Sequence, residues 1–154
     1  MSKIIQILLV EDNPADADLT RETLQTSPLK IDLTVAVNGM EAVDCVYKRG
    51  RFSAASTPDL ILLDLNLPGL DGKAVLAEIK QDAELKKIPV SILSSSSSER
   101  DITQSYQLGA NCYVVKPIDF KSFQNIVRSI ENFWFGTVKL PDDTPDSKAA
   151  VTGN

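Results

Sequence analysis

The sequence predicts a single α/β domain, in which a parallel sheet carries helices on both faces. Short apolar runs alternate along the chain with segments of helical periodicity, and turn residues separate them. Alternation of this kind is typical of a parallel sheet, because each strand must be joined to the next by a long crossover. A length of 154 residues is enough to bury the core of one such domain.

The first half of the chain shows this alternation twice. A nearly continuous apolar run suits a strand that is buried on both faces, and the first such run stops at Glu11 and Asp12. Pro28 ends the helical pattern that follows. The predicted elements are a strand at 4–10, a helix that opens at Asn13–Pro14 and reaches about Thr26, a strand at 31–37 and a helix at 40–47.

The second half begins with the most apolar strand, which stops at Asp64. A serine run at 94–98 is expected to be a flexible loop in which four of the five serines have no further role. The predicted elements are a strand at 60–63, a helix ending near Lys80, a strand at 89–93, a helix at 99–108, a strand at 112–115 and a last amphipathic helix at 119–134.

Composition and charge limit the possible functions. A formal net charge of -5 and a pI of about 4.7 argue against binding to nucleic acid or to anionic membranes. The apolar N-terminal run is too short for a signal peptide or a membrane span, so we expect a cytoplasmic protein. The domain is predicted to occupy 1–135, followed by an extension at 136–154 whose polar composition predicts disorder from about residue 141.

Polar residues follow four of the predicted strands. Glu11 and Asp12 follow the first, Asp64 the third, Ser94 the fourth and Lys116 the fifth. In open parallel sheets, chemistry is concentrated at the carboxyl ends of the strands. Each residue alone is commonly a helix cap, a turn or a solvated side chain. All of them together at one sheet edge predict a site.

The chemistry of that site follows from its charges. Three carboxylates at one edge repel each other unless a cation lies between them, and Mg2+ suits carboxylate ligands combined with phosphate oxygens. Asp64 can then act as a nucleophile that forms an acyl phosphate. Lys116 would supply positive charge and Ser94 a hydroxyl donor to the phosphoryl oxygens.

Over residues 3–134 the chain resembles the receiver domain of two-component response regulators. Four stretches carry the resemblance: ILLVEDN at 7–13, PDLILLD at 58–64, NLPGLDG at 66–72 and GANCYVVKP at 109–117. The resemblance implies a flavodoxin-like, doubly wound fold with five strands in the order 2-1-3-4-5 and five helices.

The same resemblance implies a role for each site residue. A histidine kinase would phosphorylate Asp64, and the only catalysis would be assistance of the chain's own phosphorylation and dephosphorylation. The implied roles are Mg2+ binding by Glu11, Asp12, Asp64 and the main-chain carbonyl of Asn66, a switch hydroxyl on Ser94, a rotating aromatic ring on Tyr113, an invariant lysine at Lys116 and a cis bond between Lys116 and Pro117.

Three further stretches are similar to the cyanobacterial phytochrome response regulators, which are stand-alone receivers. They are 13–16, 105–108 and 130–135. This similarity implies a phytochrome histidine kinase as partner, a downstream protein of unknown identity and a homodimer through the last helix and strand. One departure is Ser94–Ser95, where the subgroup usually has threonines; the hydroxyl remains, but its rotamers are less constrained.

The aromatic triplet at 133–135 also bears on assembly. Its three adjacent rings cannot all face inward from one helix. If the last helix packs its end onto the core, Phe133 is the first of the three rings expected to be buried and Trp134 the second. The remaining aromatic surface is expected to meet a partner subunit.

Three alternatives share parts of this pattern. A haloacid-dehalogenase-type phosphatase also combines an aspartate nucleophile, Mg2+, a hydroxyl and a lysine, but it needs a second acid where this chain has Asn66. A pseudo-receiver scaffold lacks one or more site residues, whereas all are present here. A flavin-binding electron carrier needs a Ser/Thr/Gly-rich turn after the first strand, and this chain has Glu11–Pro14 there.

Overall fold

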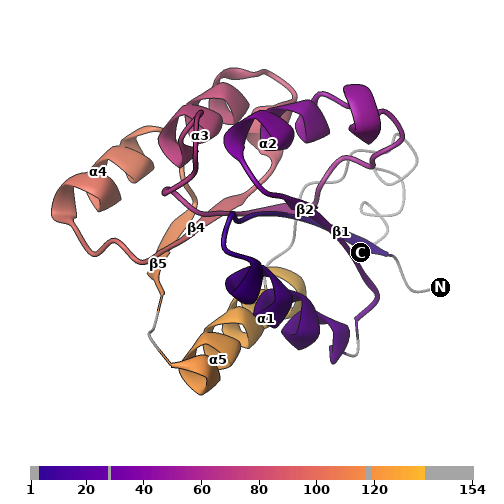
Figure 1. Ribbon diagram of the computed structural model, residues 1–154, viewed down its shortest axis with the longest axis vertical. Coiled ribbons are helices and arrows are strands. Elements are labelled where there is room, and N and C mark those ends of the chain that lie inside the picture. The colour runs from indigo at the N-terminus through magenta and orange to yellow at the C-terminus, as the bar shows by residue number, and fades with distance from the viewer. Residues whose placement is uncertain (1–3, 28, 117–118, 138–154) are drawn as a thin grey trace.

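Five parallel strands form one sheet in the computed structural model, which describes residues 4–27, 29–116 and 119–137 (Figure 1). The strands are β1 (Ile5–Val10), β2 (Ile31–Ala36), β3 (Leu60–Leu63), β4 (Val90–Ser94) and β5 (Cys112–Val115). Their order is β2-β1-β3-β4-β5, and every neighbouring pair is parallel. This order confirms the predicted doubly wound topology.

Helices cover both faces of the sheet. They are α1 (Pro14–Gln25), α2 (Gly39–Val46), α3 (Gly72–Gln81), α4 (Glu99–Gln107) and α5 (Phe120–Glu131). In Figure 1, α1 and α5 lie together on one face, and α2, α3 and α4 lie on the other. Two short 3-10 helices that the sequence pattern did not predict, Gly50–Phe52 and Leu85–Lys87, lie in the connections.

The sheet separates two hydrophobic cores. Successive side chains of a strand point to opposite faces, so a central strand needs apolar residues on both faces, and β3 is no more than 1% exposed at any of its four residues. The α2–α3 side contains Leu8, Val10, Ile61, Leu63 and Ile92 of the strands. The α1–α5 side contains Ile7, Leu9, Leu60, Leu62 and Leu93.

A side-chain cap fixes the start of each of the five helices. The cap accepts a hydrogen bond from a backbone N–H of the first turn, which would otherwise have no partner within the helix. The capping residues are Asn13, Asn38, Asp71, Ser98 and Asp119. Because each helix begins shortly after a strand ends, these caps also fix the loops at the carboxyl edge of the sheet.

The end of the last helix differs from the prediction. α5 ends at Glu131, and a π-helical segment, Asn132–Thr137, continues the chain. The wider turn changes which side chains face inward. Trp134 is buried and its Nε1 donates to Ser91 Oγ on β4 at 3.0 Å, whereas Phe133 is 50% exposed. The predicted order, with Phe133 as the first core residue, is therefore wrong.

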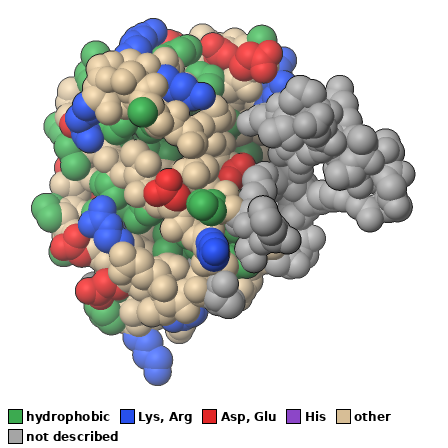
Figure 2. Space-filling view, turned by 90° about the vertical axis from the view of Figure 1, so that its right-hand side faces the viewer, with side chains coloured by type: hydrophobic (Ala, Val, Ile, Leu, Met, Phe, Trp, Pro, Cys, Tyr) green, Lys and Arg blue, Asp and Glu red, His purple; other side chains and the backbone are tan. Residues whose placement is uncertain are grey.

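Some predictions concern residues outside the described ranges. These are the cis bond between Lys116 and Pro117 and the disorder from about residue 141. Within the described ranges, no helix is both long enough and apolar enough to cross a bilayer. Figure 2 shows a face of the molecule on which acidic and basic side chains are interspersed with apolar ones.

Candidate functional site

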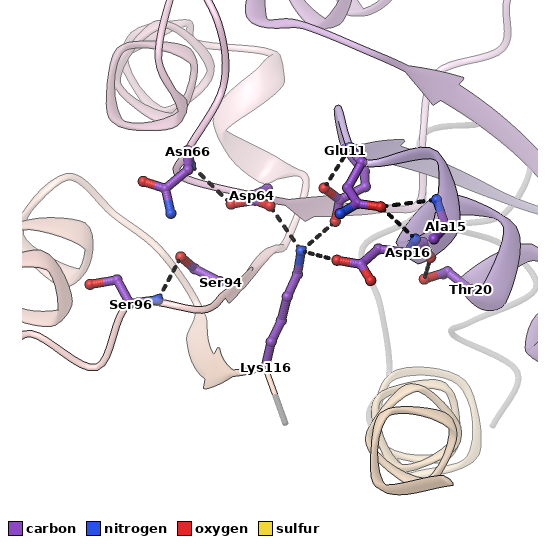
Figure 3. A network of polar contacts seen from close by, with 10 residues as sticks. Glu11, Ala15, Asp16, Thr20, Asp64, Asn66, Ser94, Ser96 and Lys116 are labelled. Atoms are coloured by element: carbon purple, nitrogen blue, oxygen red, sulfur yellow. Dashed lines mark hydrogen bonds and ion pairs between the residues drawn. The ribbon is translucent and has the colours of Figure 1, made fainter. Parts of the chain in front are cut away.

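The four charged side chains that the sequence predicted for a site meet at the carboxyl edge of the sheet. Glu11 and Asp12 directly follow β1, Asp64 follows β3, and Lys116 follows β5. One carboxylate oxygen from each of Glu11, Asp12 and Asp64 lies within 4.8 Å of the other two. Figure 3 shows the Lys116 side chain reaching in among the acids. The sheet thus gathers residues that are more than 100 positions apart in the chain.

The backbone around Asp64 is fixed on both sides. The Asp64 N–H donates to the Val10 carbonyl, which continues the ladder between β1 and β3 past the last strand residue. The Asn66 N–H donates to Asp64 Oδ1 at 2.9 Å. A Cβ on Gly72 would lie 2.3 Å from the Asp64 carbonyl oxygen, so only glycine lets α3 begin this close to the site.

Lys116 donates to three carboxylates at once. Its Nζ lies 2.6 Å from Glu11 Oε1, 2.9 Å from Asp16 Oδ2 and 2.9 Å from Asp64 Oδ2. An ammonium group has three hydrogens, so these contacts use its full donor capacity. Asp16 was not among the predicted site residues. The available signal was its position in the first turn of a helix that begins at the site edge.

Burial and charge shift two pKa values in this cluster. Burial raises the pKa of Glu11 from 4.5 to about 7; the hydrogen bond and charge of Lys116 oppose this rise, and the Asp64 charge adds to it. Burial alone would lower the pKa of Lys116, but its hydrogen bonds to Glu11, Asp16 and Asp64 raise it above the usual value. Lys116 is therefore firmly cationic and balances much of the acidic charge.

An open cavity of about 500 Å³ borders the cluster. Its lining consists of Glu11, Asp12, Asn13, Pro14, Asp16, Asp64, Asn66, Ser95 and Lys116. The predicted switch residue Ser94 does not line it. Ser94 is fully buried at the end of β4, and its Oγ accepts a hydrogen bond from the Ser96 N–H at 3.2 Å. The serine that faces the cavity is its neighbour, Ser95.

Ser96 joins the two predicted switch residues. Its N–H contacts Ser94, and its carbonyl accepts a hydrogen bond from the hydroxyl of half-buried Tyr113 at 2.8 Å. Its own hydroxyl donates to Asp101 Oδ2 on α4 at 2.5 Å. With Ser98 capping α4, these contacts correct the expectation that most of the serine run is a flexible loop.

The donor set fits a hard divalent cation. Three carboxylates provide oxygen ligands, Asp12 is exposed to the cavity, and Asn66 lines the same cavity. Glu11 and Asp64 also accept from Lys116, so part of their charge is already balanced. The negative charge of these three neighbouring carboxylates is only partly neutralised by Lys116. Such a group favours a cation that keeps several coordination positions open for other ligands.

Comparisons with known proteins agree with this geometry. Residues 7–128 match the family model described as the response regulator receiver domain. The response regulator Rcp1 of Synechocystis sp. is 46% identical over 135 residues, which cover 88% of this chain and 92% of Rcp1. A probable methanogenesis regulatory protein, FilR2 of Methanothrix harundinacea, is 34% identical over 135 residues, which cover 88% of this chain and 86% of FilR2.

Solved structures are also similar. The Mn2+-bound form of Rcp1 has a TM-score of 0.86 at 45% identity, with coverage of 90% of this chain and 99% of that chain. The phosphorylated cyanobacterial phytochrome response regulator RcpA has a TM-score of 0.88 at 47% identity, with coverage of 91% and 100%. The bacteriophytochrome response regulator AtBRR has a TM-score of 0.70 at 38% identity, with coverage of 92% and 99%.

Proposed function

Because the chain belongs to the response regulator receiver family, we propose that Asp64 is the residue at which it accepts a phosphoryl group. The chain is a phosphoacceptor of two-component signalling, similar to the phytochrome response regulators. One observation carries the assignment to Asp64. Its carboxylate ends the central strand of the sheet, borders the cavity and lies 2.9 Å from the Lys116 ammonium.

The transfer step requires a bond exchange at phosphorus. An oxygen of the Asp64 carboxylate forms a bond to phosphorus, while the bond from phosphorus to the phosphohistidine nitrogen of the kinase breaks, and that nitrogen leaves with the electron pair. Lys116 can move its hydrogen bond from Asp64 to a phosphoryl oxygen and stabilise the charge there. The Asn66 N–H holds Asp64 Oδ1 in place.

The acidic cluster supports a divalent cation as cofactor, and we propose Mg2+. Glu11, Asp12 and Asp64 would hold it, together with the main-chain carbonyl of Asn66. When bound, the cation would supply positive charge that neutralises the phosphoryl oxygens. The similarity to Rcp1, which has a solved Mn2+-bound form, supports a divalent metal at this edge.

The signal would leave the site through the β4–α4 loop. In this proposal the Ser94 hydroxyl turns toward the phosphoryl group and releases the Ser96 N–H, and Tyr113, bound to the same Ser96, adjusts with it. The neighbouring face, formed by α4, β5 and α5, would change shape and meet a downstream protein. Exposed apolar side chains on this face support a protein partner: Tyr106, Val115, Phe120 and Phe133 are each 41% to 58% exposed.

The proposed partners follow from the same similarities. Receiver domains of phytochrome response regulators interact with histidine kinases, and a phytochrome kinase is the proposed donor here. The proposal has four further parts. The protein forms a homodimer through α5 and β5, lies in the cytoplasm and has no enzymatic activity on other substrates. Its receiver domain occupies 1–135, and 136–154 is a C-terminal extension. The phosphatase alternative is not favoured, since the matched proteins are response regulators.

Phosphotransfer from a panel of labelled histidine kinases, phytochromes included, tests the function. The wild type should take up label from at least one kinase, and Asp64→Asn should take up none, because the amide cannot act as the nucleophile. Asp32→Asn is the matched control, since it removes the same charge at an exposed position at the start of β2. Label that persists in Asp64→Asn, mapped to another aspartate by mass spectrometry, would contradict the assignment.

A further inference from the structure

The Lys116 ammonium has three acceptors, and two of them are needed elsewhere. Glu11 and Asp64 belong to the carboxylate group whose oxygens lie within 4.8 Å of one another and which fits a cation. Asp64 is also the proposed phosphoacceptor. Among the described residues, Asp16 is the third acceptor of Lys116 and is not a member of that group.

The backbone of Asp16 is held rigidly at the start of α1. Its N–H donates to the Asn13 side chain at 3.2 Å, and its carbonyl accepts from the hydroxyl of buried Thr20 at 2.9 Å. The short aspartate side chain therefore projects from a fixed point, and Figure 3 shows it directed at Lys116; both residues line the cavity. Its side chain is 33% exposed, so solvent weakens the ion pair without removing it.

The geometry points to Asp16 as a positioning residue for Lys116 during phosphoryl transfer, an inference that rests on the proposed function. Once an Asp64 oxygen is bonded to phosphorus and Glu11 faces a cation, both are weaker acceptors for the ammonium group. Asp16 keeps its full charge and continues to hold Lys116 at the site. One N–H of the ammonium then stays with Asp16 while another is available to the phosphoryl oxygens.

A structural role would give a different result. An acidic residue in the first turn of a helix also interacts favourably with the helix dipole, which affects stability alone. Asp18→Ala is the matched control for the loss of one negative charge from α1, although Asp18 lies beyond the first turn. Asp18 is on the same helix, its side chain is 71% exposed, and its ion pair is with Arg21 at 3.6 Å, on the surface.

The first measurement follows the Lys116 ammonium in the metal-free protein by 1H–15N NMR, with the signal assigned by its loss in Lys116→Arg. Hydrogen exchange at this ammonium should be faster in Asp16→Ala than in the wild type or in Asp18→Ala. Asp16→Asn should lie between, because its amide oxygen still accepts a hydrogen bond, and this isosteric variant replaces Asp16→Ala if the latter does not fold.

The second measurement is the rate of Asp64 labelling by acetyl phosphate at saturating Mg2+. In this reaction an Asp64 oxygen bonds to phosphorus as the bond from phosphorus to the acetyl oxygen breaks, and acetate leaves with the electron pair. Asp16→Ala should be about ten-fold slower than the wild type, the effect of losing one hydrogen bond to a charged group. Asp18→Ala should remain within about two-fold of the wild type, as expected for a surface substitution.

Two results would overturn the role of Asp16. One is an unchanged exchange rate of the Lys116 ammonium in Asp16→Ala. The other is an Asp16→Ala variant in which the Lys116 ammonium exchanges faster but Asp64 is labelled as fast as in Asp18→Ala. Asp16 would then be an ion-pair partner of Lys116 in the resting state alone. A wild type that takes up no label, or an Asp64→Asn variant that is labelled as the wild type is, would instead refute the proposed function, and the exchange measurement would still test the contact.

Discussion

Two lysines, Lys73 and Lys116, organise the charges at the carboxyl edge in different ways. Lys116 is 10% exposed and holds three carboxylates of one cluster. Lys73 connects two helices, because its Nζ on α3 lies 2.6 Å from both Asp101 Oδ1 and Gln104 Oε1 on α4. The hydrogen bond from Lys73, followed by that from Ser96, lowers the pKa of Asp101 below 3.8. Lys73 thus stabilises the charged form of an acid that also orients the serine loop.

Lys73→Met should raise the pKa of Asp101 toward its ordinary value. A depressed carboxyl pKa contributes stability above the unfolded-state value near 3.8, and this contribution is lost as the pH falls through the folded-state value. The wild type should therefore be more stable than Lys73→Met at pH 7, and the difference should shrink in acid. Carboxyl NMR titration and urea unfolding at several pH values measure the two effects.

Lys87→Met is the control for this prediction, because Lys87 is on the surface and pairs with Glu84 three residues away. An Asp101 pKa that is equal in Lys73→Met and Lys87→Met would contradict the proposed link between α3 and α4.

At the scale of elements, the start of α4 combines a helix cap with the proposed switch loop. Ser98 Oγ accepts from the Asp101 N–H at 3.2 Å, and Ser105 Oγ donates to the Asp101 carbonyl one turn later. Ser96, two residues before the cap, contacts Ser94, Tyr113 and Asp101. The loop is thereby ordered by side chains that look interchangeable in the sequence.

Ser98→Ala should lower the free energy of unfolding by about 1 kcal/mol, the usual cost of losing a serine cap. Ser97→Ala, at the exposed position just before it, should change the free energy of unfolding by less than about 0.5 kcal/mol. Chemical denaturation of both variants decides the matter. An equal change in the free energy of unfolding in both variants would mean that the cap adds no stability of its own. The two serines would then be equivalent, as the composition suggested.

The elements that the sequence predicted well are those whose signal is local. Apolar runs identify the strands because each central strand is buried on both faces, and the charged residues that end the runs identify the edge of the sheet. The role of Ser96 depends on partners 5 and 17 residues away, and the contact of Asp16 depends on Lys116, 100 residues away. Spacing along the chain does not encode such contacts.

The last helical turns of the described chain also could not be predicted from local spacing. A helix of 3.6 residues per turn predicts which side chains face inward only as long as the helix remains regular. The π-helical segment at Asn132–Thr137 breaks that regularity, and it is stabilised by a buried contact with β4 that no local pattern reveals. The predicted boundary of the helix and the order of burial of Phe133 and Trp134 failed for this one reason.

At the scale of the whole molecule, the α4–β5–α5 face is where assembly and signalling would meet. Phe133 is 50% exposed and its ring packs edge-on against Trp134 with 5.3 Å between the centroids. Phe120 on α5 and Val115 on β5 are also exposed, at 58% and 41%. If a second copy of the chain covers this face, and phosphorylation changes the shape of the face as proposed, dimer formation and phosphorylation are linked.

Phe133→Ser should weaken the proposed dimer about thirty-fold, because the exposed half of each ring would lose roughly 1 kcal/mol of burial, or roughly 2 kcal/mol for the two subunits together. Sedimentation of the wild type and the variant, with and without beryllofluoride as a phosphate mimic, measures this. Met40→Ser is the control, since Met40 is 59% exposed on α2, which follows β2 at the other edge of the sheet from β5 and lies on the opposite side of the sheet from α5. A wild type that stays monomeric at high concentration in both states would refute the dimer.

The contact between Trp134 and Ser91 has an optical consequence. Trp134 is the only tryptophan of the chain, and its indole N–H is bonded to the strand that ends in Ser94. Indole emission is sensitive to the polarity and hydrogen bonding around the ring. The intrinsic tryptophan fluorescence of the protein therefore reports on β4 near Ser91, at the end of the strand away from Ser94. A displacement of that strand would change the emission of an unlabelled sample, and stopped-flow fluorimetry could time it against phosphoryl transfer.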